Sequence, residues 1–131
     1  MFDQENVLTD DEEKELNDII VNFEKETTNE IAIVTTDNIG EHKKMVFYAV
    51  GFGDLFGIGK KDKDNGLIIV ISKALRETLI ATGKSTENIL KDEICKEIVD
   101  NQMVQEFKEG NYYQGLKDGL EECIRIWKEK E

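Results

Sequence analysis

The sequence predicts an α/β protein with a small mixed sheet of three to four strands sandwiched between helices. Short continuous apolar runs, typical of buried strands, alternate with longer segments in which apolar residues recur at helical spacing. The apolar residues, 39% of the chain, are gathered into these segments, which indicates a folded chain and argues against disorder. At 131 residues we expect a single domain over 1–131, with a frayed start at 1–8.

The first half of the chain predicts a helix, a strand and a second helix. Thr9 and Glu12 form a capping-box pattern at the start of the first helix. The apolar run 31–34 suits a strand that is covered on both faces. A second helix is expected over 45–56, where two internal glycines lower the helix propensity. The stripe of the first helix has the spacing i, i+3, i+4, i+7 and consists of Leu16, Ile19, Ile20 and Phe23.

The second half contains the strongest strand signal, the aliphatic run 67–71. Residues 77–82 follow after a short link, which predicts an antiparallel hairpin. Two further helices are expected, one long helix from Asp92 to Phe107 and one after Gly110. Because a helix connects the strands at 31–34 and 67–71, these two strands should be parallel, with a right-handed crossover.

This topology places the loops 57–66 and 83–92 at one end of the sheet. Their acidic residues are Asp62, Asp64, Glu87 and Asp92. Hard divalent cations prefer oxygen ligands, so the sequence predicts a Ca²⁺ or Mg²⁺ site between the two loops. Two plainer interpretations stay open. The loop 57–66 could be a solvated turn before a strand, and Asp92 could instead cap the helix that follows it.

The loop sequence also resembles a known family. Phe56 to Lys61, followed by Asp64-Asn65-Gly66 and an aliphatic strand, is similar to the TPM domain pattern, and the segment 110–115 matches its later part. The resemblance implies an α/β sandwich. The family includes thylakoid-lumen proteins linked to photosystem repair, to which acid phosphatase activity and calcium binding are ascribed. Carried onto this chain, the resemblance implies functional roles for Asp64, Asn65, Glu87 and Asp92, whereas Asp62 comes from the loop geometry alone.

Four positions depart from the family pattern. Phe56 stands where a tryptophan is usual, and Gln105 stands where a proline is typical. Lys84 and Ser85 replace a tyrosine and a glycine, so the backbone beside Glu87 should differ from that of other members.

The composition of the chain limits the kinds of partner that it can bind. The chain carries 29 acidic and 17 basic residues, a formal charge of -12, which repels phosphate backbones and excludes general nucleic-acid binding. No apolar stretch reaches the roughly 20 residues of a membrane span, and no signal peptide is seen, so we expect a soluble, cytoplasmic monomer without membrane insertion.

Cys95 and Cys123 fall on helical apolar faces and should be buried free thiols. His42 is the only histidine, which argues against a zinc site or a histidine-dependent triad.

Three functions are compatible with these features. The first is a binding module that holds a divalent cation through its acidic loops and presents a surface to a protein partner. The second is a metal-assisted phosphomonoester hydrolase, in which Lys60 or Lys61 would attract the phosphate. The third is a structural domain whose loops are passive. The charge of the chain favours the binding module over an enzyme that acts on anionic substrates.

Overall fold

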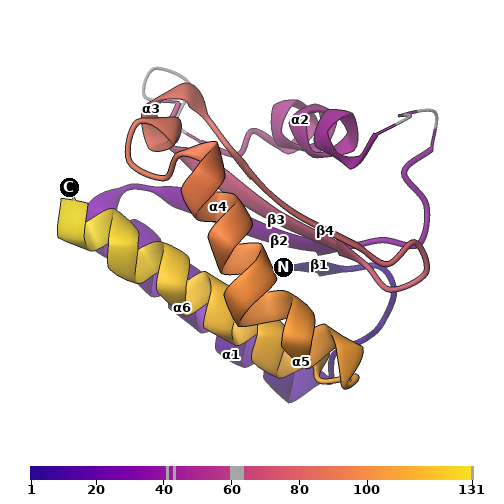
Figure 1. Cartoon of the computed structure of the whole chain (residues 1–131). Helices are drawn as coiled ribbons and strands as arrows, with labels where there is room; N and C mark the ends of the chain where they lie inside the picture. The colour runs from indigo at the N-terminus through magenta and orange to yellow at the C-terminus, as the bar shows by residue number, and fades with distance from the viewer. Residues whose placement is uncertain (41, 43, 60–63, 131) are drawn as a thin grey trace.

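The computed structural model describes residues 1–40, 42, 44–59 and 64–130 and confirms the α/β class (Figure 1). A four-stranded sheet lies between two helical layers: α2 covers one face, and α1, α4 and α6 cover the other. In chain order, the elements are β1 (Phe2–Asp3), α1 (Asp10–Thr27), β2 (Glu30–Thr35), α2 (Met45–Phe56), β3 (Gly66–Ser72), β4 (Glu77–Thr82), α3 (Lys84–Glu87), α4 (Asp92–Ile98), the π-helical turn η1 (Val99–Met103), α5 (Val104–Lys108) and α6 (Tyr112–Lys130).

The strands are arranged in the order β1-β2-β3-β4. β1 and β3 both run parallel to β2, and β4 runs antiparallel to β3. Glu30 pairs with Gly66 and Leu67 pairs with Thr82, so the start of β2, the start of β3 and the end of β4 lie at the same end of the sheet. The predicted parallel pair and the predicted hairpin are both confirmed.

The continuous apolar run of β3 arises because both of its faces are buried. Leu67, Ile69 and Ile71 belong to the larger core, which α1, α4 and α6 complete. Ile68 and Val70 belong to the smaller core beneath α2. Every residue of β3 is buried, so a strand with polar alternation could not occupy this position.

The capping box of α1 is present as predicted. The Thr9 hydroxyl accepts a hydrogen bond from the amide of Glu12 at 3.1 Å, and the Glu12 carboxylate accepts one from the amide of Thr9 at 2.9 Å. The helix ends at Thr27, and Thr28 adopts a left-handed backbone conformation with φ of 67°.

The N-terminal residues 1–8 differ from the expectation that they fray. Phe2 and Asp3 form the edge strand β1, paired with Val34 and Thr35, and Leu8 is buried in the larger core. Asp3 fixes the segment, because its carboxylate accepts hydrogen bonds from the amides of Val7 and Leu8 and from the Thr35 hydroxyl. A two-residue strand carries no periodicity, so the sequence could not reveal this non-local pairing.

The helix predicted from residue 92 to residue 107 is helical throughout but is interrupted by η1. In this turn the amide of Val104 donates to the carbonyl of Val99. Met103 is fully buried there and lies against Gly115 and Gly119 of α6. Periodicity alone does not distinguish a π-helical turn from an uninterrupted helix.

Both cysteines are buried and free, as predicted. Burial, followed by the nearby charges of Asp92 and Glu87, raises the pKa of the Cys95 thiol to about 11. Burial also raises the pKa of the Cys123 thiol. These thiols are therefore protonated at neutral pH and serve as small core residues. Within the described ranges, the structure contains no helix with the length and apolar character needed to span a bilayer.

Candidate functional site

The two loops expected to meet at the rim of the sheet do meet. The carbonyl of Asp64 accepts a hydrogen bond from the amide of Ser85 at 3.2 Å, and the amide of Gly83 donates to the carbonyl of Gly66 at 2.9 Å. The end of the first loop and the beginning of the second are thus joined by main-chain hydrogen bonds. Their adjacency is a consequence of the hairpin, since β4 returns to the end of the sheet at which β3 began.

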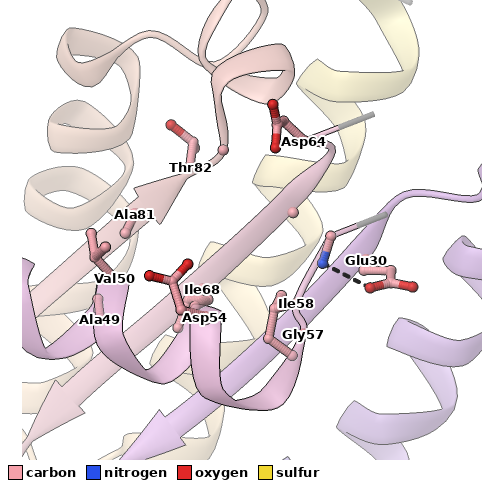
Figure 2. Close-up of a pocket in the computed structure, with 14 residues that line it drawn as sticks. Glu30, Ala49, Val50, Asp54, Gly57, Ile58, Asp64, Ile68, Ala81 and Thr82 are labelled. Carbon is pink, nitrogen blue, oxygen red and sulfur yellow. Dashed lines mark hydrogen bonds between the residues drawn. The ribbon is translucent and has the colours of Figure 1, made fainter. Parts of the chain in front are cut away.

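A cavity of about 670 Å³ lies between α2 and the sheet at this rim (Figure 2). Ile68 of β3 and Ala81 of β4 line its sheet side, while Ala49 and Val50 line it from α2. Toward the rim, the glycine-rich turn 57–59, Gly66 and Gly83 line it with main chain. The cavity therefore has an apolar interior and a polar rim.

Three carboxylates from three different elements line the cavity: Glu30 of β2, Asp54 of α2 and Asp64 of the loop before β3. Glu30 Oε1 accepts a hydrogen bond from the amide of Gly59 at 2.7 Å, which ties the turn at 57–59 to β2 (Figure 2). The hydroxyl-bearing Thr82 adds a further oxygen to the lining. Among the described lining residues, none is a lysine, arginine or histidine, and the charged ones are these three acids.

Of the predicted site residues, Asp64 lines this cavity, with a left-handed backbone at φ of 49°. Asn65 is buried, and its Nδ2 donates to the carbonyl of Thr28 at 3.0 Å and to Oδ1 of Asn29 at 3.1 Å. The side-chain amide of Asn65 thus stabilises the turn between α1 and β2. Asp62 lies outside the described residues, as do Lys60 and Lys61.

Glu87 and Asp92 lie in a neighbouring groove of about 490 Å³, which follows β4 between α2 and α4. Both side chains are exposed. Thr82 lines the groove and the cavity, so the two hollows adjoin at the end of β4. Asp92 is the first residue of α4, where its charge complements the helix dipole, but the start of α4 has no side-chain cap hydrogen bond.

The candidate carboxylates that the structure describes therefore lie in two adjacent hollows. Glu30, Asp54 and Asp64 line the cavity, and Glu87 and Asp92 line the groove. Over residues 1–40, 42, 44–59 and 64–130, no three histidine, cysteine, aspartate or glutamate side chains are grouped closely enough to hold an ion. The four-carboxylate site, which includes Asp62, stays a prediction.

Sequence reasoning missed Glu30 and Asp54. Asp54 is the only charged residue in the otherwise apolar α2, and a single charge in such a helix is a signal that could have identified it. Glu30 opens β2, but no local pattern indicates that its carboxylate reaches a turn 29 residues away.

The fold defines a class: α/β domains in which a small mixed sheet lies between helical layers, here with an acidic cavity at one rim. The chain belongs to the TPM domain family, whose model matches residues 1–126. The resemblance deduced from the loop sequence is thereby confirmed, while the comparisons do not extend to its thylakoid-lumen members.

Two solved structures share the fold. One is the solution NMR structure of the N-terminal domain of a protein from P. gingivalis, with a TM-score of 0.88 and 24% identity over 98% of this chain and 82% of that chain. The other is the NMR structure of the BA42 protein from the psychrophilic bacterium Bizionia argentinensis, with a TM-score of 0.78 and 24% identity over 96% of this chain and 85% of that chain. At this identity the two structures support the fold alone. No curated protein sequence matches the chain significantly.

Proposed function

We propose that this TPM domain is a divalent-cation binding module, which takes up Ca²⁺ or Mg²⁺ in the cavity at the rim of its sheet. One observation carries the proposal: Glu30, Asp54 and Asp64 line a single cavity whose described walls contain no basic side chain. The carboxylates would attract a cation in this cavity, and the apolar side chains beside them strengthen that attraction by lowering the local dielectric constant.

The arrangement favours a hydrated ion over a fully caged one. Ca²⁺ takes six to eight oxygen ligands, and Mg²⁺ typically retains several waters and binds one or two carboxylates. Asp54 and Asp64 come from opposite walls, α2 and the loop before β3, and the cavity is large enough to hold an ion with part of its water shell. Such a site has few direct protein ligands, so we expect weak binding, with a Kd on the order of 0.1–1 mM.

Cation occupancy would also order the rim. Asp64 belongs to the loop that is hydrogen-bonded to Ser85, so an ion held by the Asp64 carboxylate stabilises both loops at once. This coupling supports the idea that cation binding prepares the adjoining surface for a protein partner.

The metal-assisted hydrolase remains a second hypothesis from the family resemblance. The described residues supply no specific observation in its favour: the cavity is lined with carboxylates, which repel a phosphate ester. Lys60 and Lys61, which would attract the phosphate, lie outside the described residues. We therefore base the proposal on cation binding.

Calorimetric titration with CaCl₂ and MgCl₂ of protein freed of cations tests the proposal. We expect saturable binding, and we expect Asp54→Asn and Asp64→Asn each to weaken it at least tenfold. Asp18→Asn is the matched control, because it removes the same charge from an exposed pair on α1 and should leave binding unchanged. An equal loss with the control, or no saturable binding at millimolar Ca²⁺, would refute the cavity as a cation site.

Two further variants separate the cavity from the four-carboxylate site predicted from the sequence. The double variant Glu87→Gln, Asp92→Asn changes only the neighbouring groove. If one ion is shared by both loops, this variant and Asp62→Asn weaken binding as strongly as Asp64→Asn. If the cavity alone binds the ion, we expect the double variant to change the Kd less than about threefold, because Glu87 and Asp92 would then act only through an electrostatic interaction that salt screens.

A further inference from the structure

The strand β4 forms one edge of the sheet, with α2 over one face and α4 over the other (Figure 1). Its six residues, 77–82, pair one-to-one with β3 and contain no bulge. The sequence Glu-Thr-Leu-Ile-Ala-Thr contains no proline, glycine or lysine. Proteins usually protect exposed edges with charged residues, with proline, with bulges or with very short strands. Apart from the charge of Glu77 at its first position, β4 has none of these features.

The alternation of hydrogen-bonded and non-hydrogen-bonded pairs between β3 and β4 identifies which backbone groups of β4 face outward. The amide of Gly83 donates to the carbonyl of Gly66, so this pair is of the hydrogen-bonded type. In antiparallel pairing the two types alternate, so residues 77, 79 and 81 bond to β3. Thr78, Ile80 and Thr82 consequently direct their amides and carbonyls away from β3. In the part of the chain that the structure describes, these groups form no hydrogen bond outside the sheet.

The outward groups lie along the groove of about 490 Å³ between α2 and α4. The two walls of the groove differ in chemistry. From α2 come Val46 and Val50, which are 41% and 53% exposed. The opposite wall carries three acids and one base: Glu87, Asp92, Asp100 and Lys96.

We propose that the β4 edge is a docking site for an extended segment of another protein, which adds to the sheet as a fifth strand. Successive side chains of a strand point to opposite faces, so the partner's residues would face the two walls in turn. Apolar residues would pack on Val46 and Val50, and lysine or arginine residues would face Glu87, Asp92 and Asp100. The partner is therefore a segment in which apolar and basic residues alternate.

Charge complementarity favours this partner over a second copy of the chain. Two copies joined through β4 would bring two acidic walls together, on molecules with a formal charge of -12 each. A basic segment is attracted by the same charge, which raises its association rate at low ionic strength. Main-chain hydrogen bonds provide the affinity, and the two walls provide the specificity. The proposal does not depend on cation binding, because it uses only the groove.

A synthetic peptide tests the proposal: seven residues that alternate lysine and valine, blocked at both ends, added to the full chain in buffer free of divalent cations. We expect amide hydrogen exchange at Thr78, Ile80 and Thr82 to slow at least tenfold at saturation. Two control peptides, one with glutamate in place of lysine and one with the lysines and valines in separate blocks, should bind at least tenfold more weakly. Equal binding of either control, or slowed exchange elsewhere but not on β4, would overturn the proposal.

Variants of the protein test separately the outward backbone groups of β4 and the acidic side chains of the groove. Thr78→Pro removes one outward amide but no hydrogen bond to β3, so an edge strand tolerates it, and Thr78→Val is its matched control. We expect Thr78→Pro to weaken the peptide at least tenfold and Thr78→Val less than twofold. The double variant Asp92→Asn, Asp100→Asn should weaken it at least threefold, while Glu121→Gln on α6 has no effect.

Two results would contradict the docking site directly. If thermal unfolding shows that Thr78→Pro is folded and it still binds the peptide with unchanged affinity, the edge is not the site. If Thr78→Pro does not fold, the charge variants decide, and affinity unchanged by Asp92→Asn, Asp100→Asn overturns the proposal. A protein that forms dimers through β4, detected by light scattering and by slowed exchange at Thr78 without peptide, would identify a second copy as the occupant instead.

Discussion

The carbonyl oxygen of Asp64 lies 2.4 Å from the position that a β-carbon on residue 83 would occupy, and Gly83 alone leaves room for it. The same carbonyl accepts a hydrogen bond from the amide of Ser85 at 3.2 Å. This contact joins the loop that carries an acidic cavity residue to the loop that leads to the acidic wall of the groove. The absence of one side chain therefore determines how closely the two candidate surfaces can lie.

Gly83→Ala should destabilise the protein, because the new β-carbon would collide with main chain that cannot rotate away. We expect the free energy of unfolding to fall by about 1–3 kcal/mol, the usual cost of overpacking. Urea unfolding measures it. Gly51→Ala is the control: it lies within α2, where the nearest atom to the new carbon is the exposed His42 ring, and it should be neutral or slightly stabilising. Equal stability of both variants would show that the two loops can separate at no cost.

Asn65→Ala should reveal a structural role for a residue that the family pattern marks as functional. The substitution removes the hydrogen bonds that the buried Asn65 side chain donates to the carbonyl of Thr28 and to Oδ1 of Asn29, and each such hydrogen bond contributes about 0.5–1.5 kcal/mol. We expect lower stability but a change of less than about threefold in the Kd for Ca²⁺. Asn101→Ala, at an exposed helical position, should change neither quantity. Loss of Ca²⁺ binding at full stability would instead identify Asn65 as a ligand.

Asp3 should make the N-terminal segment sensitive to acid. Burial acts to raise the pKa of the Asp3 carboxyl, but hydrogen bonds from the Thr35 hydroxyl and from the amides of Leu8 and Val7 outweigh it, so the pKa is lowered from 3.8. A lowered pKa in the folded state contributes stability that is complete above the unfolded value and is lost as the pH falls through the folded one. Asp3→Asn should therefore reduce stability at pH 7 but have little effect below that folded pKa.

The contribution of Asp3 to the pH dependence of stability must be measured apart from that of Glu13 on α1. Burial, then the hydrogen bond to Asp3 and its charge, raise the pKa of the Glu13 carboxyl, so that Glu13 contributes the opposite pH dependence. Thermal unfolding of Asp3→Asn against the parent, both in a Glu13→Gln background, isolates the Asp3 contribution. Asp37→Asn, an exposed position, is the control. A stability difference that is the same at pH 7 and at pH 2 would contradict the assignment.

Gly119→Ala should loosen the contact between α6 and the π-helical turn. A β-carbon at residue 119 would lie 2.4 Å from Sδ of the fully buried Met103. Alanine is the better helix former by about 1 kcal/mol, but displacing a packed side chain typically costs 1–3 kcal/mol, so we expect a net loss of stability. In a Met103→Ala background the colliding side chain is absent, so there we expect Gly119→Ala to lower the free energy of unfolding less than it does in the parent. A stabilised single variant would show that Met103 moves aside freely.

Much of the architecture could be predicted because its signals are local. The capping box at Thr9 fixes the start of α1, and the aliphatic run of β3 reports that both faces are covered. The short link before β4 indicated an antiparallel hairpin, and a helical crossover predicted the parallel pair. These two inferences together predict that Asp64 lies beside the loop after Gly83, and the hydrogen bond from the amide of Ser85 to the carbonyl of Asp64 confirms it.

Other features depend on contacts between residues distant in the chain. β1 exists because Asp3 bonds Thr35, 32 residues away, and Glu30 joins the cavity because it binds a turn 29 residues away. The division of the acids into a cavity and a groove depends on where α2 and α4 pack on the sheet. By itself, the sequence determined the fold and the rim at which its acidic loops gather, because periodicity and chain direction are encoded locally. Only the tertiary structure decided which carboxylates share a hollow, because that depends on the packing of helices over the sheet and on side chains reaching across it.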